Sequence, residues 1–317
     1  ATVTIRHWRF VPQGDSRGCM SDPVPTPPKN EDSPKGLALA VTAYLMWGFL
    51  PLYMKALAAV PVLEVLAHRV LWSVPVAGAI LIWLGRTQDL KVALRSPRMI
   101  GMAAMTAALI SINWGIYVWS IQSGQALEAA LGYYINPLFS IFLGAVLLGE
   151  RMNRAQGVAI ALAALAVGVL TWEAGRVPVI ALGLTVSWGI YAYLKKRLPL
   201  GPNQGFMLEV LILSPLAAGW LLWTGTQAGM VFGGDGRLTG LLLCAGVVTA
   251  VPLMIYANGA KLLRLSTIGI LQYIAPTMIF LTAVFLFDEP FGTARAVAFP
   301  MIWAALVIYT GSMIRRK

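Results

Sequence analysis

Long apolar segments alternate with short polar connections from residue 36 to the end of the chain. Each segment holds about 20 mostly apolar residues, which is the length that an α-helix needs to cross a bilayer. The segments are too long for barrel strands and do not alternate in polarity. We therefore predict an all-α membrane protein of ten transmembrane helices, near residues 36–58, 61–84, 98–121, 126–148, 153–172, 177–195, 205–224, 237–260, 266–287 and 292–314.

The composition supports a bilayer as the solvent for most of the chain. Only 12% of the 317 residues are charged and 58% are hydrophobic, whereas soluble chains carry about 25% charged residues. The net charge of +11 would raise nucleic acid as a partner in a soluble protein. Here the basic residues lie at the ends of apolar segments, where they determine topology, so we expect lipid and no nucleic acid.

The basic residues also predict the orientation. With the N-terminus in the cytoplasm, sixteen Lys and Arg fall on the inner side and four fall in the outer loops. A missed helix would reverse this bias halfway along the chain. The positive-inside rule therefore predicts that both termini are cytoplasmic.

The first 35 residues differ from the rest. Residues 21–35 are rich in proline and charge, so we expect a disordered tail over residues 1–35. The stretch before Met20 has no apolar core and is not a signal peptide. Met20 is a plausible natural start, and residues 1–19 could be foreign to the native protein.

The chain contains a weak internal repeat. At a shift of 139 residues several identities coincide in corresponding helices, namely Ile116-Tyr117 with Ile255-Tyr256, Tyr134-Ile135 with Tyr273-Ile274, Pro137 with Pro276 and Glu150 with Glu289. At a shift of 141, Trp47-Gly48 falls on Trp188-Gly189. We predict two five-helix repeats, 36–174 and 175–317. Because five is odd, the second repeat is inverted, an arrangement typical of secondary transporters with a substrate site between the halves.

Several strings along the chain carry a family resemblance, namely W-G-F-L-P-L-Y-M-K (47–55), A-H-R-V-L-W-S (67–73), N-W-G-I-Y-V-W (113–119), L-G-Y-Y-I-N-P-L (131–138), G-E-R (149–151), L-Q-Y-I-A-P-T (271–277) and Glu289-Pro290. Together they resemble the drug/metabolite transporter (EamA) superfamily, and in particular its RarD-like branch. The resemblance covers residues 36–314. It implies ten helices, a bacterial inner-membrane location and a central cavity lined mainly by the first, third, fourth, sixth, eighth and ninth helices. Substrates across the superfamily include amino acids, sugars, nucleotide sugars and drugs, and the RarD-like branch has been associated with chloramphenicol sensitivity.

Polar and aromatic residues are placed within those six helices. The candidate substrate-binding residues are Trp47, Asn113, Trp114, Tyr117, Tyr133, Tyr134, Trp188, Tyr191, Tyr256, Gln272 and Tyr273, with Asn136 and Asn258 beside them. One interpretation is an aromatic cage with amide partners, which suits an amphipathic ligand that is neutral or zwitterionic. The alternative is an ordinary set of interfacial aromatics and interhelical hydrogen bonds.

Two further groups could move during transport. Pro137 and Pro276 occupy equivalent repeat positions, where each could form a hinge or a tolerated kink. On the second helix, Glu64, His68 and Arg69 could form a gate or proton relay, or a local ion pair that orients the helix, and we favour the ion pair. Glu209 is expected at the membrane interface.

Other classes of function find little support. The sequence has no phosphate-binding loop, no metal-ligand spacing and no nucleophile elbow, so we expect no enzyme, no cofactor and no metal. No carboxylate is predicted mid-membrane on the six cavity helices, which argues against cationic drugs as cargo. A small-residue ridge at Ala164 and Gly168 is compatible with a monomer or a weak homodimer.

We therefore expect a secondary transporter that exports small metabolites, such as aromatic or neutral amino acids, by alternating access. A drug permease or multidrug exporter linked to chloramphenicol sensitivity is the alternative.

Overall fold

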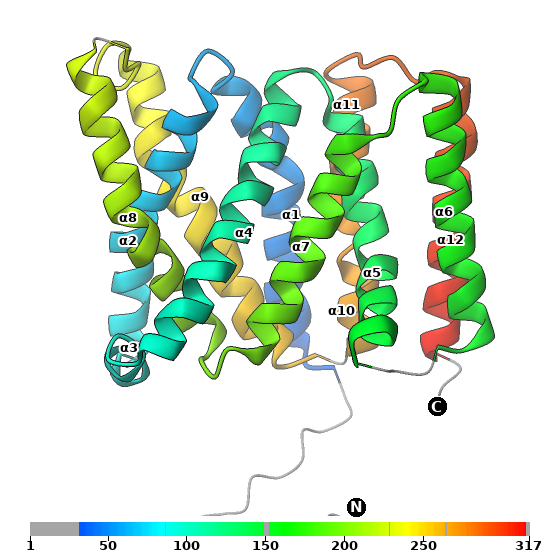
Figure 1. The fold of residues 1–317 in the computed structure, drawn as a ribbon, viewed down its shortest axis with the longest axis horizontal. Helices are drawn as coiled ribbons and strands as arrows, with labels where there is room; N and C mark the ends of the chain where they lie inside the picture. Colours follow the sequence, from blue (N-terminus) through cyan, green and yellow to red (C-terminus); the bar gives the residue numbers. More distant parts are fainter. Residues whose placement is uncertain (1–31, 86, 149–151, 228, 264, 315–317) are drawn as a thin grey trace, which may run out of the picture. The chain divides into compact units, whose positions relative to one another are not determined.

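The computed structural model describes residues 32–85, 87–148, 152–227, 229–263 and 265–314. Within these ranges the backbone forms helices and short connections, with no strand (Figure 1). The predicted disorder before residue 32 and the repeat residue Glu150 lie outside the described residues.

The described chain contains twelve helices. They are α1 (Pro34–Ala56), α2 (Val62–Trp83), α3 (Gln88–Ala93), α4 (Pro97–Gln122), α5 (Ala126–Leu148), α6 (Arg154–Ala174), α7 (Val179–Arg197), α8 (Pro202–Thr226), α9 (Gly236–Ala260), α10 (Leu265–Leu271), α11 (Ile274–Phe285) and α12 (Thr293–Ile314). Nine spans are long and apolar enough to cross a membrane, and one of these, Thr267–Phe285, joins α10 to α11. The shorter apolar stretch Val179–Lys195 of α7 supplies a tenth, which confirms the all-α membrane fold.

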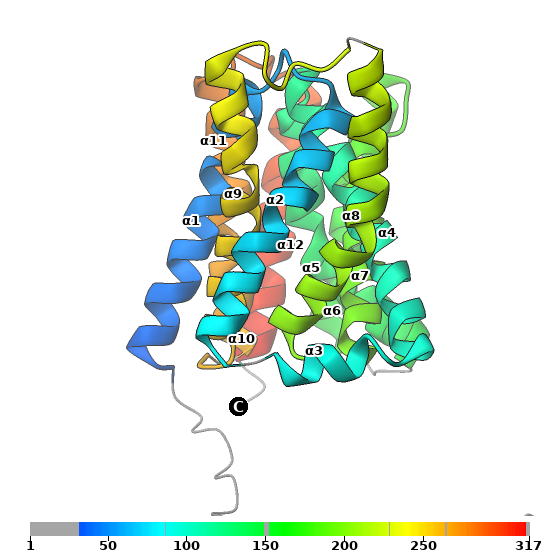
Figure 2. The same ribbon diagram turned by 90° about the vertical axis from the view of Figure 1, so that its left-hand side faces the viewer.

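Helix α3 is an element that the hydropathy pattern does not reveal. It occupies part of the connection between α2 and α4 and packs against α8 (Figure 2). The amide nitrogen of Gln204 donates to the carboxylate of Asp89 at 3.2 Å. A six-residue helix is too short for a transmembrane signal, which explains why it was not predicted.

The ninth predicted span is broken, whereas its repeat counterpart is continuous. The break between α10 and α11 falls at Gln272 and Tyr273, and Pro276 follows in the first turn of α11. Proline has no backbone N–H, so it cannot bond the carbonyl of Gln272 one turn earlier. Pro137, in contrast, lies inside the uninterrupted helix α5.

Helix packing follows the inverted repeat. In chain order, α1, α2, α4, α5 and α6 correspond to α7, α8, α9, α10–α11 and α12. Helix α1 packs against α9 and α11, and its counterpart α7 packs against α4 and α5. Likewise, α2 packs on α9 and α8 packs on α4. The equivalent helices α6 and α12 lie side by side (Figure 1), as a pseudo-twofold relation between the halves requires.

Individual contacts repeat in the same way. A Cβ atom added to Gly48 would lie 2.4 Å from the sulfur of Met278, and one added to Gly189 would lie 2.5 Å from the ring of Phe139. Gly48 corresponds to Gly189, and Phe139 to Met278, so one close helix approach occurs twice. The glycines therefore permit the tight packing of α1 on α11 and of α7 on α5.

The small-residue ridge on α6 takes no part in this packing. Ala164 and Gly168 are both exposed, and nothing lies within 4 Å of a Cβ atom added to Gly168. Helix α6 packs against α12 and α5, and its buried residues are Gln156, Ala159, Ala163 and Ala166.

A buried carboxylate fixes the start of α5. Glu289 lies in the connection between α11 and α12, and its two oxygens accept hydrogen bonds from the N–H groups of Ala126, at 2.6 Å, and Leu127, at 2.9 Å. These N–H groups have no partner within the helix, and the helix dipole favours a negative charge there. Glu289 therefore ties the second half of the chain to the first.

We expect Glu289→Ala to lower the free energy of unfolding by about 1–3 kcal/mol for each N–H group left without a partner. Glu173 is a suitable control because its carboxylate is exposed and accepts one bond, from Thr293. Chemical unfolding in detergent micelles should show a clear loss for Glu289→Ala and a small one for Glu173→Ala. Equal losses would contradict a capping role for Glu289.

Candidate central cavity

A cavity of about 200 Å³ lies between the two halves. It is lined by side chains of α1, α2, α4, α5, α7, α9 and α11 and by the α10–α11 break. Its lining is mostly aromatic and apolar, with a few polar groups, as in binding sites for small organic molecules. The lining residues are Tyr44, Trp47, Leu50, Arg69, Asn113, Trp114, Tyr117, Tyr133, Asn136, Trp188, Leu253, Tyr256, Gln272, Ala275, Pro276 and Ile279.

Most of the candidate binding residues meet in this cavity. Those that line it are Trp47, Asn113, Trp114, Tyr117, Tyr133, Trp188, Tyr256 and Gln272, together with Asn136 and Pro276. They come from six helices spread along the sequence, so their meeting results from the inverted packing.

Three candidates point elsewhere. Tyr134 and Tyr273, which are equivalent in the repeat, stack on each other with ring centroids 6.5 Å apart. The Tyr134 hydroxyl shares a 2.8 Å hydrogen bond with Thr277. Tyr191 donates to Glu209 at 3.3 Å. Each of these side chains stabilises helix packing, and none of the three lines the cavity.

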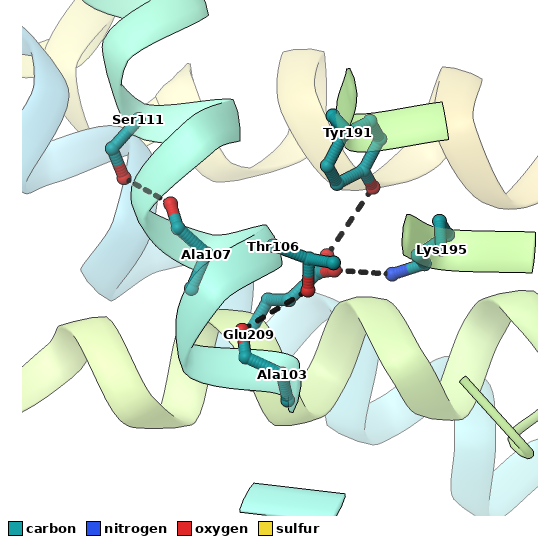
Figure 3. Close-up of polar contacts among 7 residues, drawn as sticks. All are labelled: Ala103, Thr106, Ala107, Ser111, Tyr191, Lys195 and Glu209. Carbon is teal, nitrogen blue, oxygen red and sulfur yellow. Dashed lines mark hydrogen bonds and ion pairs between the residues drawn. The ribbon is translucent and has the colours of Figure 1, made fainter. Parts of the chain in front are cut away.

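Glu209, for which we predicted an interfacial position, is buried in an ion pair that the sequence did not indicate. Glu209 is 1% exposed and accepts a hydrogen bond from the ammonium of Lys195 at 2.6 Å. Figure 3 shows Lys195 and Tyr191 of α7 converging on this carboxylate of α8. Hydropathy gives the depth of a residue and not the partner that faces it, so the sequence did not reveal this ion pair.

Two groups of aromatic rings form the cavity wall. Tyr44, Trp47 and Tyr256 contact one another, with ring centroids 5.4–5.6 Å apart. Tyr117 and Tyr133 form a second pair at 5.8 Å. Rings from different helices thus present faces and edges to one space, which suits a flat apolar group.

The amides add polar groups at defined places. Asn113 donates to the carbonyl of Leu184 at 3.1 Å and to the hydroxyl of Ser187 at 2.9 Å. These bonds use its amino group and leave its oxygen facing Tyr133. Asn136 is 7% exposed, and its side-chain oxygen has no hydrogen-bond partner. Asn258 instead bonds the carbonyl of Met254 within its own helix and is not part of the lining.

The charged residues of α2 do not form the local ion pair that we favoured. The carboxylate of Glu64 accepts from the backbone N–H groups of Val231, at 3.1 Å, and Phe232, at 2.8 Å, which lie between α8 and α9. The His68 ring stacks on Phe232 and accepts from Trp72. The sequence spacing places Glu64 and His68 on one helix face, but the Glu64 carboxylate forms its hydrogen bonds with a loop that is distant in sequence.

Arg69 reaches the cavity alone. It is 3% exposed, its Nε donates to the Thr249 hydroxyl at 3.0 Å, and its guanidinium lies 4.6 Å from the ring centre of Trp114. One terminal nitrogen, Nη1, has no hydrogen-bond partner. The sequence interpretation placed Arg69 in a gate or ion pair and did not recognise it as a lining residue.

Tyr44 is the aromatic lining residue that the sequence analysis missed. It precedes Trp47 by three positions, so the two residues share a face of α1. Applying that spacing rule to α1 would have identified it.

Residues 34–172 match the EamA-like transporter family. An uncharacterized transporter of Vibrio cholerae is 43% identical over 89% of this chain and 94% of its own length. The protein RarD of Streptomyces exfoliatus is 42% identical over 88% of this chain and 89% of its own length.

A solved crystal structure shares the fold, with a TM-score of 0.60 and 20% identity over 86% of this chain and 96% of that one. This likeness concerns the fold alone.

Proposed function

Because this chain belongs to the EamA-like transporter family and is similar to proteins called RarD, we propose that it is a secondary transporter of the bacterial inner membrane. It would export small amphipathic metabolites by exposing the central cavity alternately to each side. In this proposal both termini are cytoplasmic, in agreement with the distribution of Lys and Arg.

The position of the cavity is the observation that carries the proposal. Its walls come from both halves, and the halves are related by an inverted pseudo-twofold arrangement. Rocking one half against the other can open such a site first to one side and then to the other. A buried aromatic site with no such symmetry would fit a receptor or enzyme equally well.

The lining favours an aromatic or bulky apolar cargo such as an aromatic amino acid. The rings of Trp47, Tyr256 and Trp188 offer large flat surfaces, and the amides of Asn113 and Gln272 offer hydrogen bonds. Among the described lining residues none is acidic, so the cavity offers no counter-charge to a cationic drug.

We expect saturable flux of labelled aromatic amino acids in proteoliposomes that contain the purified protein. Trp188→Ala and Tyr117→Ala should each reduce the flux severalfold, because each removes a ring from the cavity wall. Trp172→Ala is the matched control, since Trp172 is 91% exposed at the end of α6.

Flux that rises linearly with concentration would point to a channel and contradict a transporter. If Trp188→Ala and Trp172→Ala reduce the flux equally, the cavity is not part of the transport pathway. Chloramphenicol should be included as an uncharged aromatic cargo, because drug transport is the alternative that the family resemblance raises.

A further inference from the structure

The guanidinium of Arg69 has no negatively charged partner in the described part of the protein. Its hydrogen-bond partner, the Thr249 hydroxyl, is neutral and donates its own proton to the carbonyl of Ala245 at 2.7 Å. The face of Trp114 attracts the cation but does not neutralise it. Nη1 remains a buried donor without a partner.

Two buried acidic residues, Glu64 and Glu209, already have partners of their own. Glu64, on the same helix, is bonded to the N–H groups of Val231 and Phe232. Glu209 is paired with Lys195 at 2.6 Å. None of the described residues that line the cavity is acidic, so no side chain there is available to compensate Arg69.

A buried charge without a partner is unfavourable, and ionisable groups inside membrane segments usually serve substrate or ion pathways. Arg69 lies at the wall of the cavity and is held in place from two sides, by Thr249 of α9 and Trp114 of α4. The side chain is therefore preorganised to bind an anion that enters from the cavity.

We infer that the cargo carries an acidic group, a carboxylate, which binds the guanidinium of Arg69. The inference rests on the proposed transport function and specifies its substrate class as aromatic or apolar carboxylates. The guanidinium donates to the carboxylate, and the surrounding rings contact the apolar body of the cargo. Guanidinium and carboxylate form strong charge-assisted hydrogen bonds of this kind.

The carboxylate can come from an amino acid or from an acid that has no amine. Asn136 lines the same cavity, and its side-chain oxygen has no hydrogen-bond partner, so this amide could accept a hydrogen bond from the ammonium of an amino acid after a small rotation. Asn136→Leu should then weaken binding of the amino acid and leave the simple acid unaffected.

The test measures how tightly three probes bind to the purified protein. All three contain a phenyl ring, and they are phenylalanine, 3-phenylpropionate and the uncharged amide of 3-phenylpropionate. We expect at least one acid to bind wild type about tenfold or more tightly than the amide. Arg69→Gln should remove that preference by weakening binding of the acids far more than binding of the amide, and Arg69→Lys should retain part of it. Equal binding of acids and amide by wild type would overturn the inference, as would failure of both acids to bind.

A second readout is independent of the cargo. If Arg69 awaits an anion, Arg69→Gln removes an uncompensated buried charge, and the melting temperature of the ligand-free protein should stay level or rise. If Arg69 has a purely structural role, the melting temperature should fall, and that result would overturn the inference. Absence of saturable flux for any cargo, with acid binding intact, would instead count against the proposed transport function.

Discussion

In protein that carries Gly246→Ala, we expect most of the folded, monodisperse population to be lost. Gly246 of α9 faces the backbone of α2, and an added Cβ atom would lie 2.1 Å from the carbonyl carbon and oxygen of Trp72. Overpacking against side chains typically costs about 1–3 kcal/mol. Backbone atoms cannot rotate away, so α2 and α9 must separate and the cost should reach or exceed the upper end of that range.

Gly240 is the matched control on the same helix. A Cβ atom added there meets nothing within 4 Å, so Gly240→Ala should leave the yield and the melting temperature close to wild type. Size-exclusion chromatography and thermal unfolding in detergent measure both variants. A wild-type melting temperature for Gly246→Ala would show that α2 and α9 are farther apart than described.

The second large effect is expected at the buried ion pair. Lys195→Met leaves the Glu209 carboxylate, which is 1% exposed, with only the Tyr191 hydroxyl as a partner. Breaking a buried pair by removing one partner typically costs about 3–5 kcal/mol, because the remaining charge is uncompensated. We expect a loss of this order in the free energy of unfolding.

The double variant Lys195→Met/Glu209→Gln distinguishes the pair from general packing. It removes both charges, so much of the lost stability should return. If the double variant loses as much free energy of unfolding as the two single variants together, the two groups do not interact, and the ion pair drawn in Figure 3 does not form.

Much of the membrane fold is predictable from the sequence, because the length of each apolar segment and the charges of each loop can be read from short stretches of the chain. The ten spans agree with the helices within a few residues. The break at Gln272 and Tyr273 was not predicted as such, although Pro276 marked the region. Its counterpart Pro137 lies in an intact helix, so the proline alone does not determine the break.

The cavity was predictable only in part, because hydropathy does not give the rotation of each helix about its axis. Tyr133 faces the cavity, whereas its neighbour Tyr134 faces α11 and α12. The partner of Glu64 lies 167 residues away, at Val231, where no spacing rule within one helix could find it. Hydropathy likewise does not show whether the Arg69 side chain faces the cavity or a neighbouring helix.

The uncompensated guanidinium also has an electrical consequence. A charge that moves through the whole membrane potential gains or loses about 2.3 kcal/mol per 100 mV. The empty cavity contains the positive charge of Arg69, whereas a bound monoanion would make the occupied cavity neutral. The voltage would then act mainly on the return of the empty carrier, so a resting cell could drive the cycle in one direction without a coupling ion.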